Sequence, residues 1–193
     1  MLLPRKLIST IQRIHGWLTE DEADALLSAV IDAVLETDYR AVVEIGSYKG
    51  RSTVLLAKTL EAIAPGGRLY AIDPHDGNVP GFDNHPPTWE EWQRTIEAHG
   101  CVNVEPMRMT AIDASYRIAD SLTLAFIDGL HDYDSIVRDY EAVEPLMVSG
   151  SIVAFHDYGN PQFPDVQRAV DALAENAPLT WIGRYDTLAV LKV

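Results

Sequence analysis

The stretch VVEIGSYKGRST, residues 42–53, decides the fold of this chain. It opens with an apolar run, Val42, Val43 and Ile45, that is broken by Glu44. A turn with glycines at Gly46 and Gly50 follows and leads into an apolar pattern of helical spacing. A strand, a glycine turn and a helix in this order are typical of a nucleotide-type site in a doubly wound α/β sheet. Glycine lets the backbone turn sharply and approach a ligand, and the free N–H groups near Ser52 can face a negative group.

The second predicted strand narrows the choice of ligand. The turn has the spacing G-x-x-x-G, with Tyr48 where a dinucleotide fingerprint has its second glycine, which disfavours a nicotinamide dehydrogenase. The stretch RLYAID, 68–73, ends on Asp73, and an acidic residue there can accept hydrogen bonds from both ribose hydroxyls. Glycine turns also occur in α/β proteins that bind nothing. The prediction of a bound ligand therefore depends on Asp73. Residues 44–53 and Asp73 together resemble the S-adenosylmethionine site of class I methyltransferases.

Composition and charge restrict the class of protein. The chain has 193 residues, of which 47% are hydrophobic, and this suits one domain with a full core. A formal net charge of −14 repels phosphate backbones and anionic membranes, so we expect neither nucleic acid nor a membrane as a partner. The single cysteine, Cys101, excludes an internal disulfide, and we find no bilayer-spanning run and no signal-peptide pattern. We therefore expect a cytoplasmic enzyme.

Helical and strand patterns alternate along the chain. The predicted helices are 5–16, 21–37, 51–62, 89–99, 111–118, 134–147 and 165–175, and the predicted strands are 41–45, 68–72, 102–107, 123–127 and 151–155. Two further strands in 179–193 form a closing hairpin joined at 184–186. The alternation predicts a single α/β domain over 1–193: a doubly wound, Rossmann-like sheet, mostly parallel, with helices on both faces. The hairpin adds an antiparallel strand near one edge.

Two segments depart from this alternation. Residues 1–38 are predicted to form an N-terminal helical cap, whose second helix begins after Thr19 with three acidic residues. The cap could cover the sheet, close over the ligand or make a dimer contact. Residues 74–92 are rich in Pro, Gly, Asp, Asn and His and lack periodicity; we interpret them as a flap over the active site, the alternative being a disordered surface insertion. Thr88 and Glu91 have capping-box spacing.

Acidic and imidazole side chains follow two later strands. Asp128 follows one strand, and His156 and Asp157 follow the next. Neighbouring strands lie about 4.8 Å apart, and ligands of open α/β sheets bind at the carboxyl edge. Asp128 and Asp157 could hold a divalent cation, with His156 as a third ligand, and His131 could accept a proton from a substrate hydroxyl. Each residue alone is more often structural, but together they favour a metal or proton-transfer site.

Most of the chain resembles the metal-dependent small-molecule O-methyltransferases of class I, in particular the macrocin and mycinamicin sugar O-methyltransferases and the catechol-type enzymes. The resemblance rests on GWLTEDEA (16–23), VVEIGSYKGRSTVLLA (42–57), LYAIDPHDG (69–77), FIDGLHDYDSIVRDYE (126–141) and GSIVAFHDYG (150–159). It implies S-adenosyl-L-methionine as the cofactor. It also implies a hydroxylated small molecule, such as a sugar or polyketide, as the acceptor.

The resemblance assigns roles to individual residues. The cofactor would be bound by Glu44, Gly46, Ser47, Tyr48, Gly50, Ser52, Asp73, Pro74, Thr110, Ala111 and Asp128. Asp128 and Asp157 match the metal aspartates, and His131 matches the general base of the sugar-modifying members, which makes Asp128 and His131 the catalytic pair. At His156 the family usually has an acidic residue. A histidine there would favour Mn²⁺ over Mg²⁺ or weaken metal binding.

Two other functions stay open at this point. A metal-independent methyltransferase would use His131 or His156 alone as a base or orienting group. A non-catalytic protein would bind S-adenosylmethionine as a sensor or partner subunit. The sequence shows neither the identity of the acceptor nor whether the chain forms a homo-oligomer.

Overall fold

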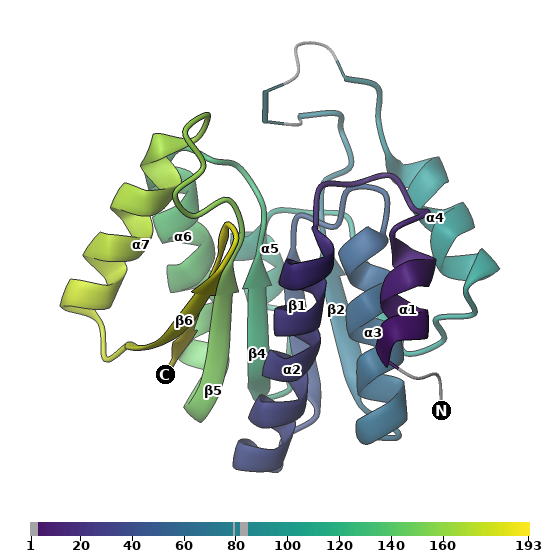
Figure 1. Ribbon diagram of the computed structural model, residues 1–193, viewed down its shortest axis with the longest axis horizontal. Helices are drawn as coiled ribbons and strands as arrows, with labels where there is room; N and C mark the ends of the chain where they lie inside the picture. The colour runs from purple at the N-terminus through teal and green to yellow at the C-terminus, as the bar shows by residue number, and fades with distance from the viewer. Residues whose placement is uncertain (1–3, 79, 82–84) are drawn as a thin grey trace.

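The computed structural model describes residues 4–78, 80–81 and 85–193. They form a seven-stranded sheet in the order β3-β2-β1-β4-β5-β7-β6, with helices on both faces (Figure 1). The strands are β1 (Ala41–Ile45), β2 (Arg68–Ile72), β3 (Val104–Met107), β4 (Leu122–Ile127), β5 (Met147–Phe155), β6 (Thr180–Tyr185) and β7 (Leu188–Lys192). This is the predicted α/β fold.

The order of the strands creates a crevice at the centre of the sheet. The first five strands are parallel, and β1 lies between β2 and β4, so the chain winds outward in opposite directions from the β1–β4 pair. Ligands of open α/β sheets bind at such a switch point, beyond the carboxyl ends of the strands. At the other edge β7 is antiparallel to both β5 and β6, which confirms the antiparallel strand predicted from the closing hairpin.

The helices cover the two faces in two groups. They are α1 (Pro4–Ile11), α2 (Glu20–Thr37), α3 (Arg51–Ile63), α4 (Trp89–Ala98), α5 (Ala111–Ser115), α6 (Tyr133–Val143) and α7 (Pro164–Asn176). Side chains of α1, α2 and α3 pack on one face of the sheet, and those of α5, α6 and α7 pack on the other. The N-terminal helices therefore cover a sheet face, one of the three roles that the sequence left open.

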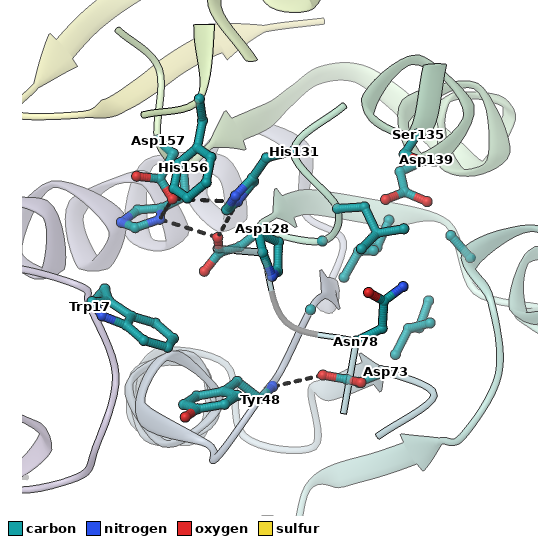
Figure 2. A pocket seen from close by; sticks show the side chains of 18 of the residues that line it. Trp17, Tyr48, Asp73, Asn78, Asp128, His131, Ser135, Asp139, His156 and Asp157 are labelled. Atoms are coloured by element: carbon teal, nitrogen blue, oxygen red, sulfur yellow. Dashed lines mark hydrogen bonds and ion pairs between the residues drawn. The ribbon is translucent and has the colours of Figure 1, made fainter. Parts of the chain in front are cut away.

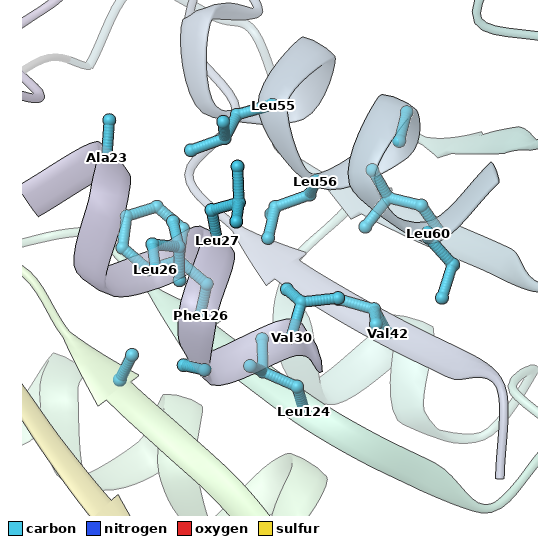
Figure 3. Close-up of a cluster of buried hydrophobic side chains, with 14 of the residues drawn as sticks. Ala23, Leu26, Leu27, Val30, Val42, Leu55, Leu56, Leu60, Leu124 and Phe126 are labelled. Atoms are coloured by element: carbon cyan, nitrogen blue, oxygen red, sulfur yellow. The ribbon is translucent and has the colours of Figure 1, made fainter. Parts of the chain in front are cut away.

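The core follows from the period-2 alternation of the buried strands. In β1, Val42 points into the cluster under α2 and α3, whereas Val43 points into the cluster under α5 to α7. Figure 3 shows the first cluster, in which Leu27 of α2 lies beside Leu56 of α3 and Leu26 lies beside Phe126 of β4. Because β1 and β4 are fully buried on both faces, they are apolar almost throughout.

Several element ends differ from the sequence prediction. Helix α6 ends at Val143, and a short 3₁₀ turn η1 (Glu144–Leu146) with a proline at its start follows, so β5 begins at Met147 and not at 151. Helices α1 and α5 end at Ile11 and Ser115, earlier than predicted. A proline cannot donate the hydrogen bond that continues a helix, which explains the first of these differences.

The two predicted helix caps behave differently. Thr19 caps α2 in a complete capping box with Glu22. Thr88 makes no capping hydrogen bond to α4, and its hydroxyl instead bonds to His75 Nδ1 at 2.8 Å. The predicted flap, 74–92, falls partly outside the described residues, at 79 and 82–84, and its last turn belongs to α4. Among the helices that the structure describes, none is both long and apolar enough to cross a membrane.

Candidate active site

A cavity of about 1070 Å³ opens at the carboxyl edge of the sheet. Its wall is assembled from the ends of β1, β2, β4 and β5, from the segment before α2, and from the β6–β7 turn. Figure 2 shows Asp73 on one side of this cavity and Asp128, His131, His156 and Asp157 on another. The predicted cofactor residue Asp73 and the predicted acidic and imidazole residues after β4 and β5 therefore line the same cavity. Its size is at the upper end of the range of small-molecule pockets, which leaves room for a cofactor and an acceptor.

Gly46 allows the two halves of the sheet to meet at the cavity. Its φ is +88°, and a Cβ atom at this position would lie 1.9 Å from the carbonyl oxygen of Asp128. No other residue fits there, because the loops after β1 and β4 touch at this point. Tyr48, two residues later, also has a positive φ of 45°, a conformation that a non-glycine residue rarely adopts. Strained backbone of this kind clusters at binding sites.

Asp73 is fixed at the end of β2 by two backbone N–H groups. Its Oδ2 accepts from the N–H of Tyr48 at 2.8 Å, and its Oδ1 accepts from the N–H of His75 at 2.7 Å. Each carboxylate oxygen still has a lone pair for another donor. Asp73 lines the cavity, so its free lone pairs are available to the two hydroxyls of a ribose. The residues present therefore fit an adenosine-containing cofactor.

The predicted cofactor residues fall into two groups. Those that line the cavity are Gly46, Tyr48, Asp73, Pro74, Thr110, Ala111 and Asp128. Those outside its lining are Glu44, Ser47, Gly50 and Ser52. The start of α3 is covered by the loop after α1, where Arg51 donates to the carbonyl oxygens of Ile14 and Leu18. This contact explains why the predicted helix start does not reach the cavity.

Asp128, His131 and Asp157 form the group best suited to a metal ion. Each offers one ligand atom, and the three atoms lie within 4.8 Å of one another. His131 Nε2 lies 3.4 Å from Asp157 Oδ2 and 3.6 Å from Asp128 Oδ1. Both ring nitrogens of His131 are buried, and neither has a hydrogen-bond partner among the described residues. A buried imidazole that makes no hydrogen bond is costly, and a cation bound between these three residues would remove that cost.

His156, the metal ligand predicted from the sequence, is placed differently. Its Nδ1 lies 3.2 Å from both Asp128 Oδ1 and Asp157 Oδ2, and its Nε2 lies 3.2 Å from Glu22 Oε2. Burial alone would lower the pKa of His156, but these three carboxylates raise it well above its ordinary value. The protonated ring donates from both nitrogens and has no lone pair for a metal. The structure thus brings His131, and not His156, into the metal-type group.

The contacts of Asp128 with the two histidines keep its carboxylate ionised. Burial would raise the pKa of Asp128, but His156 and His131 lower it to about 2, so its carboxylate is ionised at neutral pH. Asp157, which has a positive φ of 61°, faces both His131 and His156 through its Oδ2. The site can hold a cation, orient a hydroxyl group and accept a proton.

Three of the cavity residues that the sequence analysis did not assign to the site are notable for their side chains. Glu22 was interpreted only as an acidic residue in the first turn of α2, but its carboxylate is buried and lines the cavity. Trp17 stands at the rim with its ring 4.9 Å from that of Tyr48. Asp139 of α6 also lines the cavity. The helical pattern places Glu22 on the same face as Leu26, and this position was the available signal for its burial.

A comparison with family models gives one match. The model of a family described as a methyltransferase domain matches residues 43–158, more than half of the chain. The matched region begins in β1 and ends just after Asp157, so it includes Asp73 as well as the acidic and imidazole residues after β4 and β5.

Solved structures share the fold at low sequence identity. NovP, an O-methyltransferase, gives a TM-score of 0.74 at 16% identity, over 92% of this chain and 82% of its own. CalS11, a TDP-rhamnose 3'-O-methyltransferase of calicheamicin biosynthesis, gives 0.66 at 20% identity, over 99% and 87%. An O-methyltransferase from Bacillus cereus in complex with SAH gives 0.71 at 15% identity, over 97% and 90%. This similarity supports the architecture described above.

Proposed function

This chain belongs to the methyltransferase-domain family, and on that premise we propose that it transfers a methyl group from S-adenosyl-L-methionine to a hydroxyl group of a small molecule. One observation carries the proposal. Asp73, suited to a ribose, and the group of Asp128, His131 and Asp157, suited to a hydroxyl, line the same cavity. We infer a sugar or polyketide acceptor, and the sugar is in keeping with CalS11, which is named as a TDP-rhamnose 3'-O-methyltransferase.

The residues of this chain would act mainly by position. Asp73 would hold the ribose, and Gly46 would let the cofactor approach the backbone at the switch point. S-adenosylmethionine supplies an electrophilic methyl group on a sulfonium. Asp128, His131 and Asp157 would orient the acceptor hydroxyl toward that methyl group, and this alignment supplies much of the rate enhancement. The walls of the cavity would exclude water from the reaction.

We infer that the same three residues hold a divalent cation. Such a cation would supply positive charge that favours the deprotonated form of an acceptor hydroxyl. Two carboxylates and one imidazole form a mixed oxygen and nitrogen donor set, which suits Mn²⁺ better than Mg²⁺. The observation in favour of this cation is that the buried nitrogens of His131 make no hydrogen bond among the described residues.

A metal-independent reaction is the second candidate, and His156 favours it. The protonated ring of His156 already places a positive charge between Asp128 and Asp157, where a cation would otherwise be required. In this case His131 would itself accept the proton of the acceptor hydroxyl as a general base. The two candidates share the cofactor and the methyl transfer and differ only in how the proton is removed.

The environment of the protein is inferred from the same features. The net charge of −14 makes nucleic acid and anionic membranes poor partners, and the single cysteine, Cys101, is free and buried, as suits the cytoplasm. We infer that the acceptor is a soluble small molecule.

Calorimetric titration with S-adenosylhomocysteine tests the cofactor. We expect saturable binding by the wild type and a loss of affinity of roughly 10- to 100-fold in Asp73→Ala, since hydrogen bonds to a charged group are lost. Asp32→Ala removes an exposed acid from α2 and is the matched control. A wild type that releases no heat with this ligand would reject the cofactor.

Mn²⁺ titration and a methyl-transfer screen separate the two candidates. If a cation is held, the wild type and the control His99→Ala bind one Mn²⁺ each, whereas His131→Ala and Asp157→Asn do not. If no cation is used, chelator leaves the activity intact, and His131→Ala still lowers it by roughly 100-fold or more. The screen uses labelled S-adenosylmethionine with hydroxylated sugars and polyketides. Binding without any turnover would favour a non-catalytic sensor.

A further inference from the structure

Asp139 is an acidic cavity residue that the proposed reaction does not use. It lies on α6, lines the cavity, and points its carboxyl group into it (Figure 2). No hydrogen bond to this carboxyl group is found among the residues that the structure describes. Its Oδ2 would lie 2.7 Å from a Cβ atom on Gly129, so the glycine leaves the carboxyl group room to face the cavity. The side chain is half-buried, and a polar ligand in the cavity would give its carboxyl group a partner.

Asp139 belongs to one particular end of the cavity. Gly129 lies beside its carboxyl group, and helix α5, which packs against α6, contributes the apolar lining residues Ala111 and Ile112, with Met109 from the segment after β3. Figure 2 shows Asp139 and Asp73 on the side of the cavity away from Trp17 and Asp157. If Asp73 holds the ribose, the base attached to that ribose reaches the apolar end beside Asp139. The reacting methyl group then points the other way, toward Asp128.

The chemistry of Asp139 matches the edge of an adenine. Burial raises the pKa of Asp139 to about 7, so a large fraction of the carboxyl groups is protonated near neutral pH. A protonated carboxyl group has one donor and one acceptor. Adenine presents a donor, its 6-amino group, next to an acceptor, N1. Asparagine and glutamine side chains recognise adenine through a comparable donor–acceptor pair.

We propose that Asp139 recognises the adenine base of the cofactor, accepting a hydrogen bond from the 6-amino group and donating its carboxyl proton to N1. This inference rests on the proposed function, because it presupposes an adenosyl cofactor in the cavity. Asp139 is then a specificity-determining residue. It selects adenine over bases or substituted adenines that lack the amino donor, and it takes no part in methyl transfer.

The test compares two ligands and two nearly isosteric substitutions. The ligands are S-adenosylhomocysteine and its N6,N6-dimethyl analogue, which cannot donate from the 6-position. The variants are Asp139→Asn, which keeps a donor and an acceptor, and Asp139→Leu, which has neither. Glu141→Ala removes an exposed acid from the same helix and is the control. Dissociation constants come from calorimetry, and thermal unfolding verifies that each variant is folded.

We expect the wild type, Glu141→Ala and Asp139→Asn to prefer S-adenosylhomocysteine by about 10-fold or more. Asp139→Leu should bind the two ligands within about threefold of each other, because only the hydrogen bond distinguishes them. Equal discrimination by Asp139→Leu and the wild type would overturn the inference, since crowding alone would then explain the preference. If the wild type binds neither ligand, the proposed function itself fails, and the inference fails with it.

Discussion

Glu44 is fully buried in β1, and its surroundings favour the protonated form. Its Oε2 accepts from the Thr53 hydroxyl at 2.6 Å, but its Oε1 has no hydrogen-bond partner among the described residues. Burial raises the pKa of Glu44 from 4.5 to about 8. The folded protein therefore keeps a proton at Glu44 that the unfolded chain releases near its ordinary pKa. Stability from this group is fully present below the unfolded pKa and is lost as the pH rises to about 8.

Glu44→Gln should remove this pH dependence. Glutamine keeps the acceptor for Thr53 but cannot ionise. The free energy of unfolding of the variant should therefore not fall as the pH rises toward the pKa of Glu44. Between about pH 5 and about pH 7.5 we expect the wild type to lose on the order of 2 kcal/mol more stability than the variant. Urea unfolding at several pH values measures the difference. Parallel pH curves for the two proteins would show that Glu44 is already ionised when folded.

Single residues differ in how far the sequence could predict them. Asp73, Asp128 and Asp157 come directly after buried strands, so their place at the carboxyl edge follows from the fold class. That His131 and not His156 joins the two aspartates could not be predicted from the fold class, because it depends on which imidazole contacts Glu22. Glu22 is 134 residues away from His156 in the chain, and no local pattern reports that contact.

Among the elements, α2, the end of β5 and the β6–β7 turn are tied together by Glu22. Its Oε1 accepts from the N–H and the hydroxyl of Thr187 at 3.0 and 2.6 Å, and its Oε2 faces His156 and accepts from the N–H of Thr19. These contacts place the helical cap against the candidate active site. The capping box at Thr19 thus has a second consequence, because the glutamate that completes the box also fixes His156.

Glu22→Ala should destabilise the protein strongly. The substitution leaves a buried imidazolium with one partner fewer and frees two donors of Thr187, and breaking a buried ion pair costs about 3–5 kcal/mol. Glu20→Ala, an exposed acid in the same first turn, should cost less than about 1 kcal/mol. Urea unfolding at neutral pH measures both. A loss of unfolding free energy below about 1 kcal/mol for Glu22→Ala would contradict a stabilising role for these contacts of Glu22.

The elements themselves were largely predictable. Strands β1 and β2 and helices α2, α3 and α7 begin and end within one or two residues of the prediction, because their apolar periodicity is strong. The early start of β5 was not predictable, since Met147 pairs with Leu122 of β4 across an irregularity in the register, and no local pattern reports such a pairing. Thr88 had capping-box spacing, but a tertiary partner, His75, takes its hydroxyl.

At the scale of the whole molecule, the cavity joins segments from nearly the full length of the chain. It is lined from Trp17 to Thr187, and all described parts meet around one sheet. A ligand in this cavity therefore contacts several elements at once. Since these elements share two core clusters on one sheet, we expect the chain to unfold as one domain.

S-adenosylhomocysteine should raise the unfolding temperature in one cooperative transition. At about 100 times its dissociation constant, a ligand that binds only the folded state adds about 2.7 kcal/mol. For a chain of this size we expect a shift of roughly 5–10 °C. Asp73→Ala should show no comparable shift at the same concentration. Calorimetry measures both, and two separated transitions in the wild type would contradict a single domain.

By itself, the sequence determined the parallel sheet, the glycine turn at Gly46 and the acidic residues at the strand ends, because periodicity and turn chemistry act over a few neighbouring residues. Tertiary structure alone decided that His131 joins the two aspartates, that His156 is held by Glu22, and that Asp139 faces the cavity. These outcomes depend on contacts between segments far apart in the chain, where burial and opposing charges set the state of each side chain.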